Sequence, residues 1–98
     1  MNKKIRNEEV DDLFRAILTL KTPEECYRFF EDLCTVSELK AMEQRYEVAK
    51  LLDGGMVYNE ILEKTGASSA TISRVNRCLN YGADGYRVIL DRMGEETK

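Results

Sequence analysis

The sequence contains no histidine, one proline and three cysteines, and these shortages exclude several kinds of site. Zinc sites use histidine and cysteine at short spacings, but Cys26 and Cys34 are not at ligand spacing, so we expect no metal. Cys78 makes the number of cysteines odd, and all three lie in apolar helical patterns. We therefore predict reduced, structural thiols.

Long apolar runs and catalytic patterns are also missing. No stretch approaches the roughly 18–20 apolar residues that a membrane span requires, and residues 1–12 lack the hydrophobic segment of a signal peptide. No nucleophile is paired with a base, and Gly54-Gly55 lacks the flanking residues of a phosphate-binding loop. We therefore predict a cytoplasmic protein without cofactor, membrane partner or enzymatic activity.

The composition is typical of a small helical protein. Hydrophobic residues make up 43% and charged residues 34% of the 98 residues, which predicts one domain over residues 1–98. The net charge of -3 does not by itself favour nucleic-acid binding, because phosphate contacts need local positive charge. However, Lys64, Arg74 and Arg77 fall in one motif, while acidic residues concentrate in the first half of the chain.

Apolar residues recur with helical spacing along most of the chain, and no strand pattern is present, so the predicted fold class is all-α. Thr22 with Glu25, and Thr35 with Glu38, form capping boxes that begin two of the helices, and Asp84 is expected to cap the last one. The six predicted helices cover residues 8–20, 22–34, 35–52, 59–64, 68–79 and 84–94.

Residues 57–79 contain two short helical patterns joined by the tight turn Thr65-Gly66-Ala67, which predicts a helix-turn-helix. In the first of these helices, Ile61 and Leu62 are expected on the apolar side. Two amphipathic helices joined by a glycine turn also describe a helical hairpin with no role in nucleic-acid binding. That alternative stays open at this point.

The second helix of the motif has two distinct faces. Ser68 or Ser69 can cap it, and Ile72, Val75 and Leu79 fall at i, i+3 and i+7, so they share one buried stripe. The opposite face combines small side chains with two arginines, which suits an approach to base edges and phosphates. Its residues are Ser69, Ala70, Ser73, Arg74 and Arg77.

The first two predicted helices, residues 8–20 and 22–34, both have wide apolar faces. One short chain does not easily cover two such faces, and a second copy is the simplest cover, so we predict a homodimer. Its dimerisation helices would lie at about residues 8–53 and 84–94. A monomeric bundle in which the faces cover each other is the alternative.

Arg45, near the middle of the third helix, and Arg74 are placed to flank a cavity between these elements. Guanidinium groups in such a cavity clamp a carboxylate or stack on a ring. Solvation at the surface, or an ion pair within the chain, is the alternative for both arginines.

The order of these residues resembles the tryptophan repressor family, most closely its YerC/YecD-type branch. Gly66-Ala67-Ser68-Ser69-Ala70-Thr71-Ile72-Ser73-Arg74 is similar to the recognition region of the family, and Thr35-Val36-Ser37-Glu38 ahead of Arg45 is similar to its third helix. The resemblance implies a six-helix, interlocked homodimer that binds double-stranded DNA and regulates transcription. A helical dimeric protein-interaction module without DNA binding is the alternative.

The resemblance also assigns contacts with DNA. It implies that residues early in the recognition helix face bases and that residues at the start of the preceding helix lie near the DNA backbone. With the arginine-bearing face described above, the predicted DNA-binding residues are Tyr58, Asn59, Ser68, Ser69, Ala70, Thr71, Ser73, Arg74 and Arg77.

The amino-acid corepressor of the family carries over less completely. In the family the corepressor lies between two arginines, which match Arg45 and Arg74 here. Thr35 matches a position in the part of the pocket that the dimer contributes. A glycine of the family is Val75 here, and a pocket serine is Cys78. Since valine takes space that an indole ring needs and a thiol is a weak hydrogen-bond partner for an ammonium group, we predict that tryptophan does not bind tightly.

Overall fold

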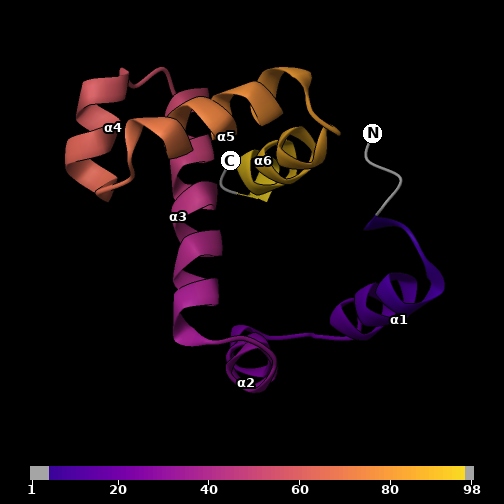
Figure 1. The fold of residues 1–98 in the computed structure, drawn as a ribbon. Helices are drawn as coiled ribbons and strands as arrows, with labels where there is room; N and C mark the ends of the chain where they lie inside the picture. Colours follow the sequence, from indigo (N-terminus) through magenta and orange to yellow (C-terminus); the bar gives the residue numbers. More distant parts are fainter. Residues whose placement is uncertain (1–4, 97–98) are drawn as a thin grey trace. The chain divides into compact units, whose positions relative to one another are not determined.

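The computed structural model describes the backbone of residues 5–96 and the side chains of residues 5–94. All regular structure in this range is helical, so the all-α prediction is confirmed (Figure 1). The single domain predicted over residues 1–98 includes residues 1–4 and 97–98, which lie outside the described range. The helices are α1 (Glu8–Ile17), α2 (Pro23–Leu33), α3 (Val36–Asp53), α4 (Tyr58–Thr65), α5 (Ser69–Tyr81) and α6 (Gly85–Glu96).

The contacts within the chain form two compact units, Met1–Leu39 and Lys40–Lys98. The first unit contains α1, α2 and the first turn of α3. The second contains the rest of α3 and the three helices that follow it, including the predicted helix-turn-helix.

Capping side chains begin α2 and α3 where the sequence predicts them. Thr22 Oγ1 accepts a hydrogen bond from the Glu25 N–H at 3.1 Å, and Pro23 occupies the first turn, where its missing N–H costs nothing. At α3, Thr35 Oγ1 accepts from the Glu38 N–H at 3.1 Å, and the Glu38 carboxylate accepts from the Thr35 N–H at 2.8 Å. The hydrogen bonds from the Thr35 backbone and hydroxyl lower the pKa of Glu38.

The ends of α1 and α6 differ from the predicted ones. α1 stops at Ile17 instead of residue 20, because Thr19 Oγ1 donates to the Ala16 carbonyl at 2.7 Å and tight turns follow. At the other end of the chain, α6 continues to Glu96, beyond the predicted residue 94. Asp84 has φ 66°, a left-handed conformation that differs from the extended backbone expected of an N-cap.

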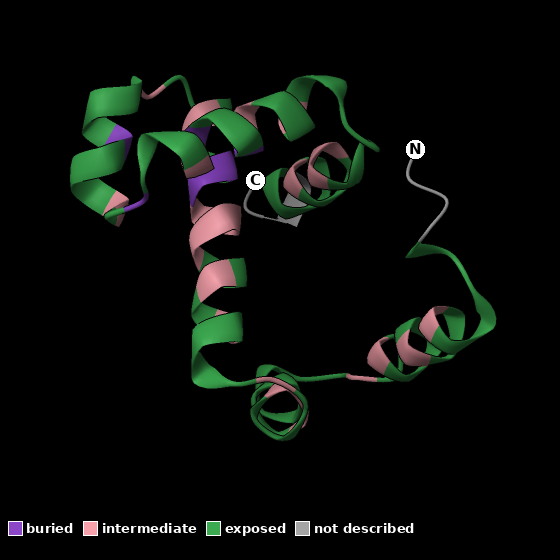
Figure 2. Ribbon diagram, in the orientation of Figure 1, coloured by how far each residue is buried: buried purple, intermediate pink, exposed green. Residues whose placement is uncertain are grey.

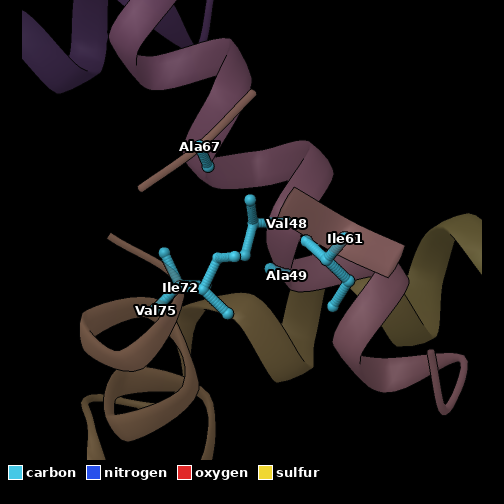
Figure 3. Packing of buried hydrophobic residues seen from close by; sticks show 6 residues of the cluster. All are labelled: Val48, Ala49, Ile61, Ala67, Ile72 and Val75. Carbon is cyan, nitrogen blue, oxygen red and sulfur yellow. The ribbon is translucent and has the colours of Figure 1, made fainter. Parts of the chain in front are cut away.

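The core of the second unit is small and lies where α3, α4 and α5 meet (Figure 3). The predicted stripe of α5 is confirmed at Ile72 and Val75, which are buried, while Leu79 is half-buried. The prediction for α4 was right for Ile61, which is fully buried, and wrong for Leu62, which is 43% exposed. The buried residues are Val48, Ala49, Ile61, Ala67, Ile72 and Val75.

The first unit has no such core within its described residues. Neither α1 nor α2 contains a buried residue, and both are coloured exposed or intermediate throughout in Figure 2. Phe14 is 53% exposed, Leu18 82% and Tyr27 62%, so much of the apolar surface predicted for these helices is uncovered. A cavity of about 550 Å³ opens on α2, lined mainly by Leu20, Pro23, Cys26, Tyr27, Phe30 and Leu39.

Candidate nucleic-acid interface

The turn between α4 and α5 has the backbone of a helix-turn-helix. Gly66 ends α4 in the left-handed conformation, with φ 73° and ψ 5°, and its N–H donates to the Leu62 carbonyl at 2.9 Å. A side chain at this φ would be strained, which explains the glycine. The chain then passes through the buried Ala67 and enters α5 at the N-cap Ser68, whose hydroxyl accepts from the Thr71 N–H at 3.1 Å.

The hydroxyls of Ser68 and Thr71 also bind each other, with Ser68 Oγ donating to Thr71 Oγ1 at 3.1 Å. Both groups therefore contribute to the cap of α5. Ser69 and Ser73 differ from them: their side chains form no hydrogen bond with residues 5–94, and both are exposed. The two serines thus retain donors and acceptors for a partner molecule.

The outward face of α5 is basic and free of carboxylates. Every residue predicted for this face is exposed, and the helix sequence SATISRVNRCLNY contains two arginines and no acidic residue. In the described part of the chain, neither Arg74 nor Arg77 forms an ion pair or a side-chain hydrogen bond. Both guanidinium groups therefore remain available for phosphate oxygens or base edges.

α4 adds two of the predicted DNA-binding residues beside this face. Tyr58, the first residue of α4, is 40% exposed, and the next residue, Asn59, is also exposed. Thr71 is the exception among the predicted DNA-binding residues, because it is half-buried at the first turn of α5.

A cavity of about 330 Å³ lies between α3 and α5 and brings together the two arginines predicted to flank a ligand. Arg45 and Arg74 both line it, and neither has an ion-pair partner among the described residues. Its remaining lining consists of Ala41, Gln44 and Thr71. Two guanidinium groups, an amide and a hydroxyl provide mostly hydrogen-bond donors, an arrangement that favours a small anionic ligand.

The other residues predicted for the ligand pocket do not line this cavity. Val75 is 1% exposed in the core, and Cys78 is exposed and lines a different cavity of about 520 Å³ with Tyr46 and Tyr86. Cys26, Cys34 and Cys78 are all free thiols, as predicted, but Cys26 and Cys78 are exposed. Thr35 belongs to the first unit, where its hydroxyl caps α3.

The sequence reasoning missed Gln44, the only glutamine of the chain. Its side chain lines the cavity with the arginines, and its Nε2 donates to the Thr65 carbonyl at 3.3 Å, at the end of α4. A polar residue four positions before the buried Val48 on the same face of α3 is the signal that could have identified it.

Among the side chains of residues 5–94, no group of three His, Cys, Asp or Glu could hold a metal ion. None of the described helices is both long enough and apolar enough to cross a membrane.

Residues 5–96 are all-helical, and α4 and α5, joined by a left-handed glycine turn, place the chain in the helix-turn-helix class. Comparison with known families narrows this class: residues 8–94 match the family described as Trp repressor protein. The chain belongs to the Trp repressor family, in agreement with the resemblance found in the sequence. This family is a class of regulators, not of enzymes.

Three relatives are similar over nearly their whole length. A Bacillus subtilis (strain 168) protein described as "Uncharacterized protein YerC" is 58% identical over 92 residues, covering 94% of this chain and 88% of its own. The crystal structure of a TrpR like protein from Eubacterium eligens ATCC 27750 is 55% identical, with a TM-score of 0.91 and coverage of 95% and 96%. A putative Trp repressor from Staphylococcus aureus is 53% identical, with a TM-score of 0.92 and coverage of 96% and 95%.

Proposed function

We propose that the protein is a cytoplasmic, homodimeric transcriptional regulator that binds specific sequences in double-stranded DNA. The observation that carries this proposal is the exposed face of α5, where two unpaired arginines and two unpaired serines lie on a helix without a carboxylate. Membership of the Trp repressor family and the similar solved structures support it.

In this function α5 enters the major groove, with its N-terminal residues toward the bases. The hydroxyls of Ser69 and Ser73 and the methyl group of Ala70 suit contacts with base edges, which give sequence specificity. Arg74 and Arg77, with Tyr58 and the backbone near the start of α4, suit contacts with phosphates, which give affinity. A net charge of -3 makes this local positive charge decisive for binding.

We propose that the effector of this regulator is a small anion and not tryptophan. The cavity that contains Arg45 and Arg74 presents charged and polar groups, and Ala41 is the only apolar residue in its lining. An indole ring gains affinity by burying apolar surface, so this lining suits a carboxylate or phosphate ester better than an aromatic amino acid.

Selection of bound fragments from a pool of duplexes by the purified protein, at several salt concentrations, tests the function. We expect enrichment of a defined sequence and an affinity that falls with salt. If no duplex binds at any salt concentration, DNA binding is refuted and a helical protein-interaction module becomes the better description.

The first variant to test is Arg74→Ala. If Arg74 contacts a phosphate, its loss should weaken binding to all duplexes and reduce the slope of log affinity against log salt by about one. Arg6→Ala, which removes the same charge ahead of α1, is the matched control and should leave the slope unchanged. An unchanged affinity and slope in Arg74→Ala would remove this arginine from the interface.

A further inference from the structure

The end of α4 contains a carbonyl group that its own helix cannot satisfy. Carbonyls in the last turn of a helix have no intrahelical partner, and an unsatisfied, partly buried carbonyl is destabilising. Thr65 is the last residue of α4, and its carbonyl accepts a hydrogen bond from Gln44 Nε2 at 3.3 Å. A side chain of α3 therefore supplies the missing donor.

Thr65 is also the residue that organises the turn. Its hydroxyl donates to the Ile61 carbonyl at 2.7 Å and accepts from the Ala67 N–H at 3.1 Å. These two bonds connect the last turn of α4 to the segment that leads into α5. The position of Thr65 therefore affects the position of both helices of the motif.

Few side chains connect distant parts of this chain. Among the described side chains, those of residues 5–94, two hydrogen bonds join residues more than twenty positions apart: Gln44 to Thr65, 21 apart, and Arg87 to Asp53, 34 apart. Only the first of them reaches the turn of the helix-turn-helix. The donor, Gln44, lies on the face of α3 that packs in the core, since Val48, one helical turn later on the same face, is fully buried.

We propose that Gln44 is a positioning residue for DNA reading, which holds the turn between α4 and α5 at a fixed place on α3. It touches no DNA in this proposal and acts through the Thr65 carbonyl. The proposal rests on the DNA-binding function proposed above, because the position of the turn sets the direction in which the exposed face of α5 points.

The bond itself can be observed directly by NMR. Because Gln44 is the only glutamine, selective ¹⁵N labelling of glutamine gives one side-chain amide. We expect one of its two N–H protons to exchange with solvent about threefold to tenfold more slowly than the other, as one hydrogen bond implies. Equal and rapid exchange of both protons would overturn the proposal.

Gln44→Met tests the consequence, because methionine has a similar length and no donor. We expect the backbone amides of Gly66 and Ala67 to exchange about threefold to tenfold faster, and duplex affinity to fall by a similar factor. The core amides of Ile72 and Val75 should keep their rates. Glu43→Gln, an exposed change at the neighbouring position, is the control for the exchange rates.

The outcomes separate positioning from a general loss of stability. Faster exchange throughout α4 and α5 would indicate a structural role and refute positioning, as would unchanged exchange at the turn. Faster exchange at the turn with unchanged duplex affinity would refute the link to DNA reading. If the unaltered protein binds no duplex, the DNA-binding function fails, while the exchange rates still decide whether Gln44 holds the turn.

Discussion

Val75 is a core residue that does not line the cavity between α3 and α5. Its side chain is 1% exposed and packs in the cluster that contains Ile72 and Val48. The preceding residue, Arg74, is exposed and lines the cavity with Arg45. The isopropyl group thus strengthens the core and adds no apolar wall to the cavity.

A calorimetric titration with tryptophan checks the prediction made from this residue. We expect no binding in the micromolar range, because the cavity lining is mostly polar and Ala41 is its only apolar residue. Circular dichroism of the same sample controls for correct folding. Micromolar affinity for tryptophan would show that the cavity opens more widely and that the effector class proposed above is wrong.

Individual residues were also the level at which the sequence predicted least. Ile61 and Leu62 are adjacent and equally apolar, so helical periodicity alone did not show that only Ile61 is buried while Leu62 remains 43% exposed. Gln44 was missed because its role depends on a carbonyl 21 positions away. Contacts between distant residues are invisible to patterns that extend over a few helical turns.

At the level of elements, the helix starts were predictable because they are local. A capping box needs only four consecutive residues, and the one at Thr35 forms both of its hydrogen bonds. At Thr22 the hydroxyl bond forms as predicted, while the Glu25 carboxylate accepts from the Lys21 N–H and not from that of Thr22. Helix ends were less predictable, as the early stop of α1 at Ile17 and the extension of α6 to Glu96 show. These ends depend on turn geometry, which several sequences adopt equally well.

The capping box of α3 makes its N-terminus sensitive to acid. The Thr35 hydrogen bonds lower the pKa of Glu38 in the folded protein, so the ionised carboxylate stabilises the fold above its unfolded pKa, and this contribution disappears as pH falls through the folded pKa. We expect the stability difference between the protein and Glu38→Gln to be present at neutral pH and to vanish in acid.

Urea unfolding of the protein and of Glu38→Gln across this pH range measures the difference. Glu31→Gln, an exposed carboxylate of α2 for which no side-chain hydrogen bond occurs in the described residues, serves as the matched control. A stability difference for Glu38→Gln that persists unchanged in acid would contradict the capping role of its charge.

At the level of the whole molecule, the uncovered apolar surface of α1 and α2 supports the proposed homodimer. Both segments are helical, yet neither helix contains a buried residue. Large exposed apolar surfaces are unusual on soluble monomers and mark association sites. Phe14 of α1, at 53% exposure, and Tyr27 of α2, at 62%, are examples, and Leu18 directly after α1 is 82% exposed.

Sedimentation equilibrium tests this assembly. We expect a species of twice the chain mass of 11.3 kDa, and we expect Leu18→Glu to shift it toward the monomer because a carboxylate is costly to bury in an interface. Leu62→Glu places the same charge on α4, outside the predicted dimerisation helices, and should remain dimeric. A protein of single-chain mass at all concentrations would refute the homodimer.

Among the described residues, the six buried side chains lie between residues 48 and 75, and this has a consequence for how the protein responds to its own concentration. If the proposed homodimer forms, the cover for α1 and α2 comes from another molecule, and its supply follows mass action. At low chain concentration the dimer would dissociate, and each chain would lose that cover before it loses its own core. The copy number of the protein would thus act as a second input to the regulator, beside any ligand.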